Sequence, residues 1–319
     1  MPKDTTTVAV LGATGHIGRG LAAELLKNPG FELFLYARRP EHLSFFLDEL
    51  EPGGKARAKP EDIENFGEKR VDIIINATGA GDPKKLHALG DGIKELTERF
   101  DRRVLGVLAD NPDALYLNMS SGAVYDSDFS SPAGPETTII DPARPGAEIA
   151  SYSVAKTQAE ARHRERADFN IVDLRVFSFF SRYIDTGGRF FIADLVRAIQ
   201  ANETLITDAQ DLYRDYVHAE DLARLVVCVI KAWRKSDVPF NRAFDVYSRG
   251  PAGKFEIIKK AEKELGLRYR VAGDEMMLSP TGPKTRYYSI NTQAMKLGYL
   301  PRYDSISTIT QIIKKLLEG

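Results

Sequence analysis

Short continuous apolar runs alternate along the chain with longer segments whose apolar positions recur at helical spacing. Residues 7–11 form the first such run, and residues 17–26 then carry apolar side chains three and four positions apart. Runs of this kind are typical of strands buried on both faces, and the helical pattern is typical of the connections that cover them. Further strands are predicted at 31–36, 71–76, 114–119 and 171–177. The alternation predicts an α/β chain with a parallel sheet.

Two long helices are predicted at about 83–108 and at 151–167, separated by a stretch at 126–148 that is rich in Pro, Gly, Ser and Asp. A loop of that length inside a compact domain is usually functional or disordered, and we expect this one to close over a substrate. Beyond about residue 177 the pattern changes to short helices and irregular segments. These short helices are predicted at 190–201, 219–233 and 254–265.

Composition limits the classes of function. Among the 319 residues, 44 Lys and Arg balance 45 Asp and Glu, which gives no support to a nucleic-acid or anionic-membrane partner. Cys228 is the single cysteine, so an intramolecular disulfide is excluded and a reducing compartment fits. No apolar stretch is long enough for a signal peptide or a membrane span, so we expect a cytoplasmic protein.

A glycine-rich turn lies between the first predicted strand and the first predicted helix. Gly12, Gly15 and Gly18 have the spacing GxxGxxG, with Thr14, His16 and Ile17 between or beside them. The first glycine permits a tight turn, the second lets a pyrophosphate approach the backbone, and the third lets helix pack on strand. The turn predicts a dinucleotide site at a helix N-terminus, the alternative being a glycine turn without a ligand. No metal is expected, because no second His or Cys lies at ligand spacing from His16.

The end of the second predicted strand bears on the choice of dinucleotide. The sequence there is Tyr-Ala-Arg-Arg, with Arg38 and Arg39 where an NAD site would carry an acid for the ribose hydroxyls. An arginine can pair with a 2′-phosphate, which favours NADP over NAD. The alternative is that both arginines are solvated surface charges.

A YxxxK motif, formed by Tyr152 and Lys156, begins the second long helix. Residues four apart share a helix face, so both side chains point toward the same place. The motif follows the strand that ends in SSGAVY at 120–125. The spacing alone arises by chance in a chain of this length, so its position after this strand carries the argument.

Together, GxxGxxG, SSGAVY and YxxxK resemble the extended short-chain dehydrogenase/reductases, and more narrowly the NAD(P)-dependent nucleotide-sugar epimerase/dehydratase group. The resemblance continues downstream: residues 214–223, RDYVHAEDLA, are similar to that group's RDYIHxxDLA segment, and residues 297–301, LGYLP, resemble its LGWxP ending. The motifs cover nearly the whole chain in the right order.

The resemblance implies a doubly wound parallel sheet, the Rossmann fold, with a smaller C-terminal substrate-binding domain. Residues 1–175 would form the dinucleotide-binding domain, with 214–235 returning to it, and residues 176–319 would mainly bind substrate. It also implies a homodimer through the two long helices.

Catalytic roles follow from the same resemblance. Tyr152 would be the acid/base, and Lys156 would bind the nicotinamide ribose. The ammonium of this lysine and a cationic nicotinamide ring would favour the phenolate form of the tyrosine. Ser121 would hold the substrate hydroxyl or carbonyl. The alternative is that the three are ordinary surface residues.

Other positions at which the family contacts its cofactor are only partly matched in this sequence. Ala77, Thr78 and Gly79 stand where the family has small residues against the cofactor, although its strand-four histidine is replaced. The acid that binds adenine in the family does not align convincingly with Asp62.

Three residues are candidates for binding the diphosphate of a nucleotide sugar. Ser178 replaces the family's diphosphate-contacting asparagine, and Arg214 matches its phosphate-contacting arginine. A salt bridge of Arg214 with Asp215 or Asp221 is the alternative. Arg286 is a weaker phosphate candidate.

The residues after Ser121 argue against two branches of the family. Gly122 and Ala123 stand where the 4,6-dehydratases have Asp-Glu, and the glutamate of the decarboxylases is also missing. Epimerisation of a nucleotide sugar through a keto intermediate is the first interpretation. The alternatives are an NADPH-dependent reductase of a keto-sugar nucleotide or other small carbonyl, and a dinucleotide-binding regulator without catalysis.

Overall fold

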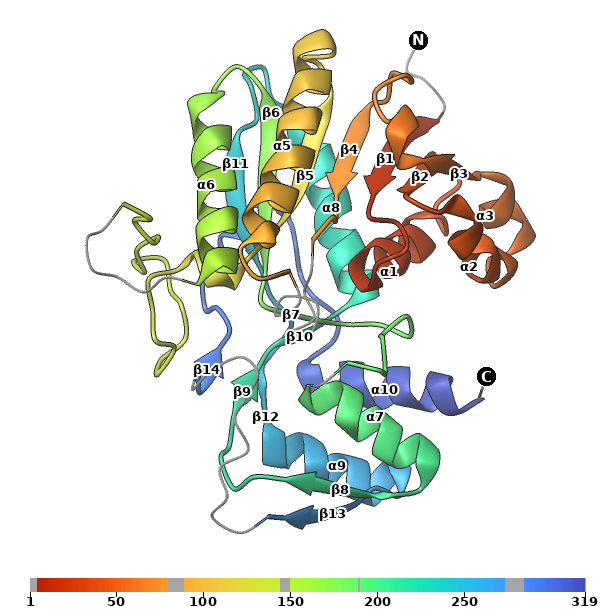
Figure 1. Cartoon of the computed structure of the whole chain (residues 1–319), viewed down its shortest axis with the longest axis vertical. Coiled ribbons are helices and arrows are strands. Elements are labelled where there is room, and N and C mark those ends of the chain that lie inside the picture. The colour runs from red at the N-terminus through yellow and green to blue at the C-terminus, as the bar shows by residue number, and fades with distance from the viewer. Residues whose placement is uncertain (1–4, 80–88, 144–149, 189, 273–283, 319) are drawn as a thin grey trace.

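A seven-stranded parallel sheet forms the centre of the computed structural model, which describes residues 5–79, 89–143, 150–188, 190–272 and 284–318 (Figure 1). From one edge to the other, the strands are β11 (Arg242–Val246), β6 (Asn170–Val176), β5 (Leu115–Ser121), β4 (Ile73–Asn76), β1 (Thr6–Leu11), β2 (Phe31–Ala37) and β3 (Ala58–Asp62). The order runs outward from β1 in both directions, which confirms the predicted doubly wound Rossmann fold.

Helices cover both faces of the sheet. On one face lie α1 (His16–Leu25) and α8 (Ala219–Trp233), and on the other lie α5 (Gly92–Asp110) and α6 (Ser151–Glu165) (Figure 1). The central strands are buried on both sides, which explains their continuous apolar sequences: Val8 and Val10 join one core and Ala9 and Leu11 the other. The predicted start of the long helix at about residue 83 lies outside the described residues.

The chain returns to the sheet after residue 214. Helix α8 packs against α1, and β11 joins β6 in parallel. The sheet thus includes residues 242–246, beyond the predicted return at 214–235, and the domain division stays a prediction. Two strands of this sheet, β3 and β11, were not predicted. β3, with the sequence AKPED, is an edge strand with largely exposed side chains, so it lacks the apolar run on which the predictions depended.

A separate apolar core forms below the carboxyl ends of the sheet strands (Figure 1). It is built from α7 (Phe191–Ala201), α9 (Lys254–Leu265) and α10 (Ser305–Glu318), with the parallel pair β8 (Thr204–Thr207) and β13 (Arg268–Val271). This core belongs to the smaller C-terminal part.

Short strands connect the sheet to this C-terminal core. β7 (Ser178–Phe180) pairs with β10 (Tyr216–His218), and β9 (Tyr213–Arg214) lies between β12 (Ala252–Gly253) and β14 (Arg286–Tyr287). The remaining short elements are η1 (Pro40–Leu43), α2 (Ser44–Asp48), α3 (Pro52–Ala56), η2 (Ile63–Asn65), η3 (Gly122–Val124) and η4 (Gln293–Leu297).

The predicted loop at 126–148 is described as far as residue 143. Phe129 and Ala133 are fully buried in it. The backbone carbonyl of Phe129 accepts from the amide of Arg286 at 2.8 Å, and the amide of Ala133 donates to the carbonyl of Tyr288 at 2.9 Å. This part of the loop is therefore packed on the segment that follows residue 284, and closure over a substrate stays a prediction.

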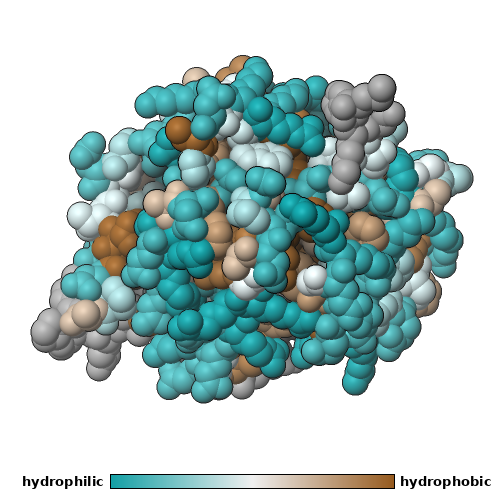
Figure 2. Space-filling model, turned by 90° about the horizontal axis from the view of Figure 1, so that it is seen from above, coloured by the Kyte–Doolittle hydropathy of each residue, from teal (hydrophilic) through white to brown (hydrophobic). Residues whose placement is uncertain are grey.

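The surface at the amino end of the sheet is mostly hydrophilic, with small separate apolar patches (Figure 2). None of the helices in the described part of the chain is both long and apolar enough to cross a bilayer.

Candidate active site

The glycine turn between β1 and α1 has the geometry that a bound dinucleotide needs. Gly12 has a φ of +77°, and a Cβ there would lie 2.6 Å from the carbonyl oxygen of Ala77. A Cβ on Gly18 would collide with the carbonyl oxygen of Gly12, so the two glycines let α1 begin close to the sheet. Gly15 is the exposed N-cap of α1, and no described side chain caps this end. The amides of the first turn can therefore bind a pyrophosphate.

The end of β4 lies beside this turn. The amide of Ala77 donates to the carbonyl of Leu11 at 3.0 Å, and the side-chain oxygen of Asn76 accepts from the amide of Thr78 at 3.0 Å. The predicted cofactor residues Ala77, Thr78 and Gly79 thus follow a strand end that is fixed against β1.

The ring of His16 is engaged by the protein. The amide of Ser181 donates to His16 Nε2 at 3.0 Å, and the ring packs edge-on against Phe179 with centroids 4.9 Å apart. Burial lowers the pKa of His16 to about 4, so the ring is neutral and can accept this hydrogen bond. Contacts of His16 with a cofactor stay a prediction, as do those of the half-buried Thr14 and Ile17.

Arg38 and Arg39 follow the end of β2 with exposed side chains. Asp62, the last residue of β3, lies in register with Ala37, the last residue of β2. Its carboxylate accepts from the amide of Glu64 at 2.9 Å. An acid therefore does lie at this edge of the sheet. Sequence reasoning considered Asp62 but could not align it convincingly, because β3 itself was not predicted.

Tyr152 and Lys156 lie near the start of α6, against the end of β5. Lys156 is 5% exposed, and its Nζ donates to the carbonyl of Met119 at 2.7 Å. The same Nζ lies 5.9 Å from the ring centre of the half-buried Tyr152. The structure therefore brings the two residues of the YxxxK motif together beside the strand that ends in Ser121.

Ser121 contacts a residue that no motif indicated. Its Oγ lies 3.2 Å from the hydroxyl of Tyr287, which comes 166 residues later in the chain. Burial raises the pKa of Tyr287 well above its usual range, and the nearby Tyr152 raises it further, so the Tyr287 hydroxyl stays protonated. The site thus contains the hydroxyl groups of Tyr152, Ser121 and Tyr287.

A buried carboxylate, Asp245 of β11, links the segment that contains Tyr287 to the segment that contains Ser121. It accepts from the hydroxyl of Tyr125 at 2.8 Å, and it also accepts from the hydroxyl of Ser289. Tyr125 closes the SSGAVY segment, and Ser289 lies two residues beyond Tyr287. Sequence reasoning missed Asp245 because it did not predict β11.

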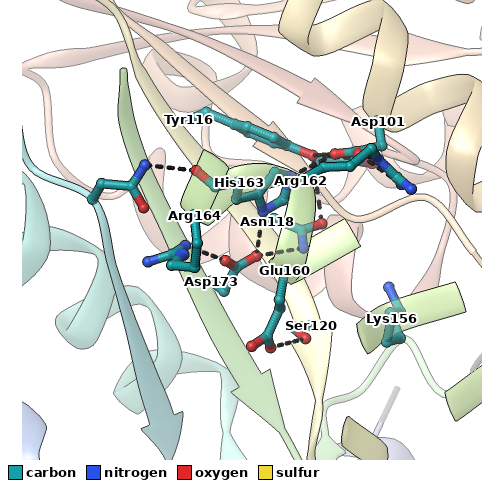
Figure 3. Close-up of polar contacts among 12 residues, drawn as sticks. Asp101, Tyr116, Asn118, Ser120, Lys156, Glu160, Arg162, His163, Arg164 and Asp173 are labelled. Carbon is teal, nitrogen blue, oxygen red and sulfur yellow. Dashed lines mark hydrogen bonds and ion pairs between the residues drawn. The ribbon is translucent and has the colours of Figure 1, made fainter. Parts of the chain in front are cut away.

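Buried polar side chains continue along α6 beyond Lys156 (Figure 3). Glu160, one helical turn further on, accepts from Ser120 Oγ at 2.6 Å and pairs with Arg175 at 2.6 Å. Ser120 is the neighbour of Ser121, so this carboxylate holds the end of β5 against α6.

His163 lies further along the same helix, between two carboxylates (Figure 3). Its Nε2 is 2.6 Å from Asp101 of α5 and its Nδ1 is 2.8 Å from Asp173 of β6. Burial alone would lower the pKa of His163, but Asp173 and Asp101 raise it to about 9. The ring is therefore an imidazolium that joins both helices to the sheet.

Arg214 lies in β9, with its guanidinium 5.7 Å from the ring centre of Tyr287. Its Nη1 donates to the carbonyl of Tyr213 at 2.9 Å. Asp215 and Asp221 accept hydrogen bonds from backbone amides instead, so the described contacts do not include the salt bridge considered as an alternative.

The other two diphosphate candidates lie on neighbouring short strands. Ser178 begins β7, half-buried, in register with Tyr216 of β10. Arg286 is exposed, with its guanidinium 4.8 Å from the ring centre of Tyr213. Successive residues of a strand point to opposite faces, so Arg286 and Tyr287 face different sides of β14. Binding of a diphosphate by Ser178, Arg214 or Arg286 stays a prediction.

These residues meet at the carboxyl ends of β1, β4 and β5, where the strand order reverses. A ligand site is expected there in an open parallel sheet. The glycine turn can bind a dinucleotide, and the neighbouring hydroxyl groups can donate a proton to a substrate oxygen or accept one from it.

Comparison with known proteins identifies the family. The sequence model of the NAD dependent epimerase/dehydratase family matches residues 8–243. The chain belongs to this family. It is therefore an enzyme of the short-chain dehydrogenase type, in a family whose members use NAD(P) and act on nucleotide sugars.

A relative of this chain is the dTDP-6-deoxy-L-talose 4-dehydrogenase (NAD(P)(+)) of Kitasatospora kifunensis. It is 26% identical over 323 residues, which cover 97% of this chain and 94% of that protein.

Two similar solved structures share the fold. The UDP-glucose 4-epimerase of Bifidobacterium longum, in complex with NAD+ and UDP, superposes with a TM-score of 0.72 at 21% identity, covering 98% of this chain and 97% of that one. The UDP-glucuronic acid 4-epimerase of Bacillus cereus, in complex with UDP-glucuronic acid and NAD, has a TM-score of 0.75 at 17% identity, covering 98% and 99% of the two chains.

Proposed function

We propose that this enzyme transfers a hydride at one sugar carbon of a nucleotide sugar, with Tyr152 as the acid/base. The observation that carries this proposal is the arrangement of Tyr152, Lys156 and Ser121 at the end of β5, at the same edge of the sheet as the glycine turn. When bound in that turn, a nicotinamide dinucleotide would supply or accept the hydride.

Each of these side chains has a task that its contacts support. The ammonium of Lys156 is anchored on the carbonyl of Met119, beside the Tyr152 ring, where it can bind the nicotinamide ribose. Ser121 and Tyr287 present hydroxyl groups that can hold the substrate oxygen while Tyr152 moves its proton. Arg214 is assigned to the diphosphate of the nucleotide.

Epimerisation is the first candidate reaction. Tyr152 would take the proton of a sugar hydroxyl as the hydride leaves its carbon, and the keto intermediate would turn over. The hydride would then return to the opposite face of that carbon, and Tyr152 would give the proton back. The dinucleotide is regenerated, so turnover needs no added reductant.

Reversible oxidoreduction of a keto-sugar is the second candidate, and two observations favour it. Arg38 and Arg39 are exposed at the end of β2, where a guanidinium can pair with the 2′-phosphate of NADP. The relative from Kitasatospora kifunensis is named as a 4-dehydrogenase using NAD(P)+. A preference for NADP is proposed on the same ground.

Two measurements separate the candidates. UDP-, dTDP-, GDP- and CDP-sugars are incubated with the enzyme and a catalytic amount of NAD(P)+, and the products are identified by NMR. An epimerase interconverts one sugar, whereas a dehydrogenase acts only when stoichiometric NAD(P)+ or NAD(P)H is added. Mass spectrometry of any copurifying dinucleotide, with affinities for NADH and NADPH, tests the role of the two arginines.

The acid/base assignment predicts the effect of Tyr152→Phe. Removing the hydroxyl should lower kcat by about 100-fold to 10,000-fold, the usual contribution of general acid–base catalysis, and leave dinucleotide binding intact. Tyr269→Phe, in β13 of the C-terminal core, is the matched control and should keep wild-type activity. Undiminished turnover by Tyr152→Phe would contradict the assignment.

A homodimer through α5 and α6 is also proposed. The exposed residues of these helices include Arg99, Arg102 and Arg164, so the contact would be polar and sensitive to salt. Light scattering at micromolar protein concentration tests it, and a monomer at low salt would contradict it.

A further inference from the structure

Lys284 lies at the substrate side of the site, although it belongs to none of the sequence motifs. The backbone that follows it is held from two directions. The amide of Tyr213 donates to the carbonyl of Thr285 at 2.7 Å, and the amide of Arg286 donates to the carbonyl of Phe129 at 2.8 Å. The ammonium of Lys284 then lies 5.1 Å from the ring centre of Phe129 and 5.0 Å from that of Tyr287.

Two cations therefore face one aromatic ring. Arg214 and Lys284 both lie against Tyr287, whose hydroxyl contacts Ser121 at the reacting end of the site. Burial lowers the pKa of both cations, and the charge of Arg214 lowers that of Lys284 further. Like charges at a half-buried place destabilise each other unless an anion lies between them or beside them.

Two buried cations that lie away from the proposed ligand site are paired with acids. Lys254 has Asp208 at 2.8 Å, and Arg175 has Glu160 at 2.6 Å. For Arg214 and Lys284, no acid from the described ranges contributes to the local electrostatics. This contrast indicates that their counter-charge comes from a ligand.

We propose that Lys284 binds the diphosphate of the nucleotide sugar together with Arg214 and thereby selects for substrates that carry it. This inference rests on the proposed function. The ring of Tyr287 separates the two cations from Ser121, as the sugar ring of a nucleotide sugar separates the anomeric phosphate from a hydroxyl on the far side. A flexible ammonium and a planar guanidinium can share the oxygens of one diphosphate.

The test is binding of dTDP, and in a second series UDP, to the enzyme saturated with dinucleotide, measured by calorimetry. Lys284→Met should weaken binding at least tenfold, and Lys284→Arg should restore most of it because the charge returns. Lys296→Met, which removes an exposed cation of η4, is the matched control and should bind as the wild type does. Thermal unfolding verifies that each variant is folded.

The outcomes separate this inference from the proposed function. If the wild-type enzyme binds neither diphosphate, both fail. If it binds them and Lys284→Met binds equally tightly, only the role of Lys284 is overturned. If Lys284→Met weakens the binding of UDP-glucuronate but not the binding of UDP-glucose or of the free diphosphates, the two cations bind a sugar carboxylate. The diphosphate assignment is then wrong.

Discussion

On the α1 and α8 side of the sheet, the buried layer is made of aliphatic side chains such as Leu21, Leu225 and Val226. On the α5 and α6 side, apolar residues share the interior with an ion network in which His163 lies between Asp101 and Asp173. Both faces exclude water, but only the second contains a buried ion network. The catalytic helix α6 belongs to the second face, so the residues that react and the buried charges share one element.

One histidine on each side makes the difference measurable, since His163 is fully buried and His16 is partly exposed. His163 has its pKa raised to about 9 by Asp173 and Asp101 against the effect of burial, whereas burial lowers the pKa of His16 to about 4. The first histidine is a cation in the folded protein, and the second is neutral. The two faces should therefore respond to pH in opposite directions.

The largest expected effect comes from removing one carboxylate of the network. Asp173→Asn removes one of the two carboxylates that pair with the buried His163 cation, and breaking a buried ion pair in this way costs about 3–5 kcal/mol of the free energy of unfolding. Urea unfolding at pH 7 measures it. Leu225→Ala on the other face should cost about 2–5 kcal/mol through a cavity, with no change in pH dependence. An Asp173→Asn protein as stable as the wild type would show that the ion network does not stabilise this face.

The stability that His163 provides should disappear at alkaline pH. Its pKa is higher folded than unfolded, so the contribution is complete below about pH 6.5 and is lost as pH rises through about 9. A shift of this size corresponds to about 3 kcal/mol. Between about pH 6.5 and pH 9, the free energy of unfolding of the wild-type protein should therefore fall by about 3 kcal/mol more than that of His163→Gln. Urea unfolding at each pH measures both proteins. Parallel pH curves for the two proteins would contradict the raised pKa.

A smaller effect of opposite sign is expected for His16. Its pKa is lower folded than unfolded, so its contribution is present above about pH 6.5 and is lost as pH falls toward 4. The ring is partly exposed, so we expect at most about 2 kcal/mol. His16→Gln can still accept from the amide of Ser181, and it should lose less stability than the wild type over this acid range. Equal acid sensitivity would mean that the ring is not buried as a neutral group.

Local patterns predicted much of the fold and the cofactor side of the site. The turn with Gly12 and Gly18, the buried strands, and Tyr152 with Lys156 each depend on spacing within one or two elements. Such signals survive in a single sequence because neighbouring residues determine them.

The substrate side was predicted less well because its contacts are distant in sequence. Tyr287 reaches Ser121 across 166 residues, and Asp245 joins Tyr125 across 120 residues. Neither contact leaves a periodic pattern. The edge strand β3 was not predicted for another reason. Its side chains are largely solvated, so it has no apolar run, and Asp62 at its end could not be assigned a position in the sheet.

Helix α6 has a practical consequence for redesign. It carries Tyr152 near its first residue and the His163 cation near its last turn, with Lys156 and Glu160 between them on buried positions. Redesign for activity at higher pH therefore has to change two properties on one helix: the stability of the fold at alkaline pH and the acid/base chemistry of the site. Replacing Asp101, His163 and Asp173 by apolar side chains that pack together would remove the pH dependence of stability that this network causes. The first turns of the helix, which carry the reacting residues, would stay unchanged.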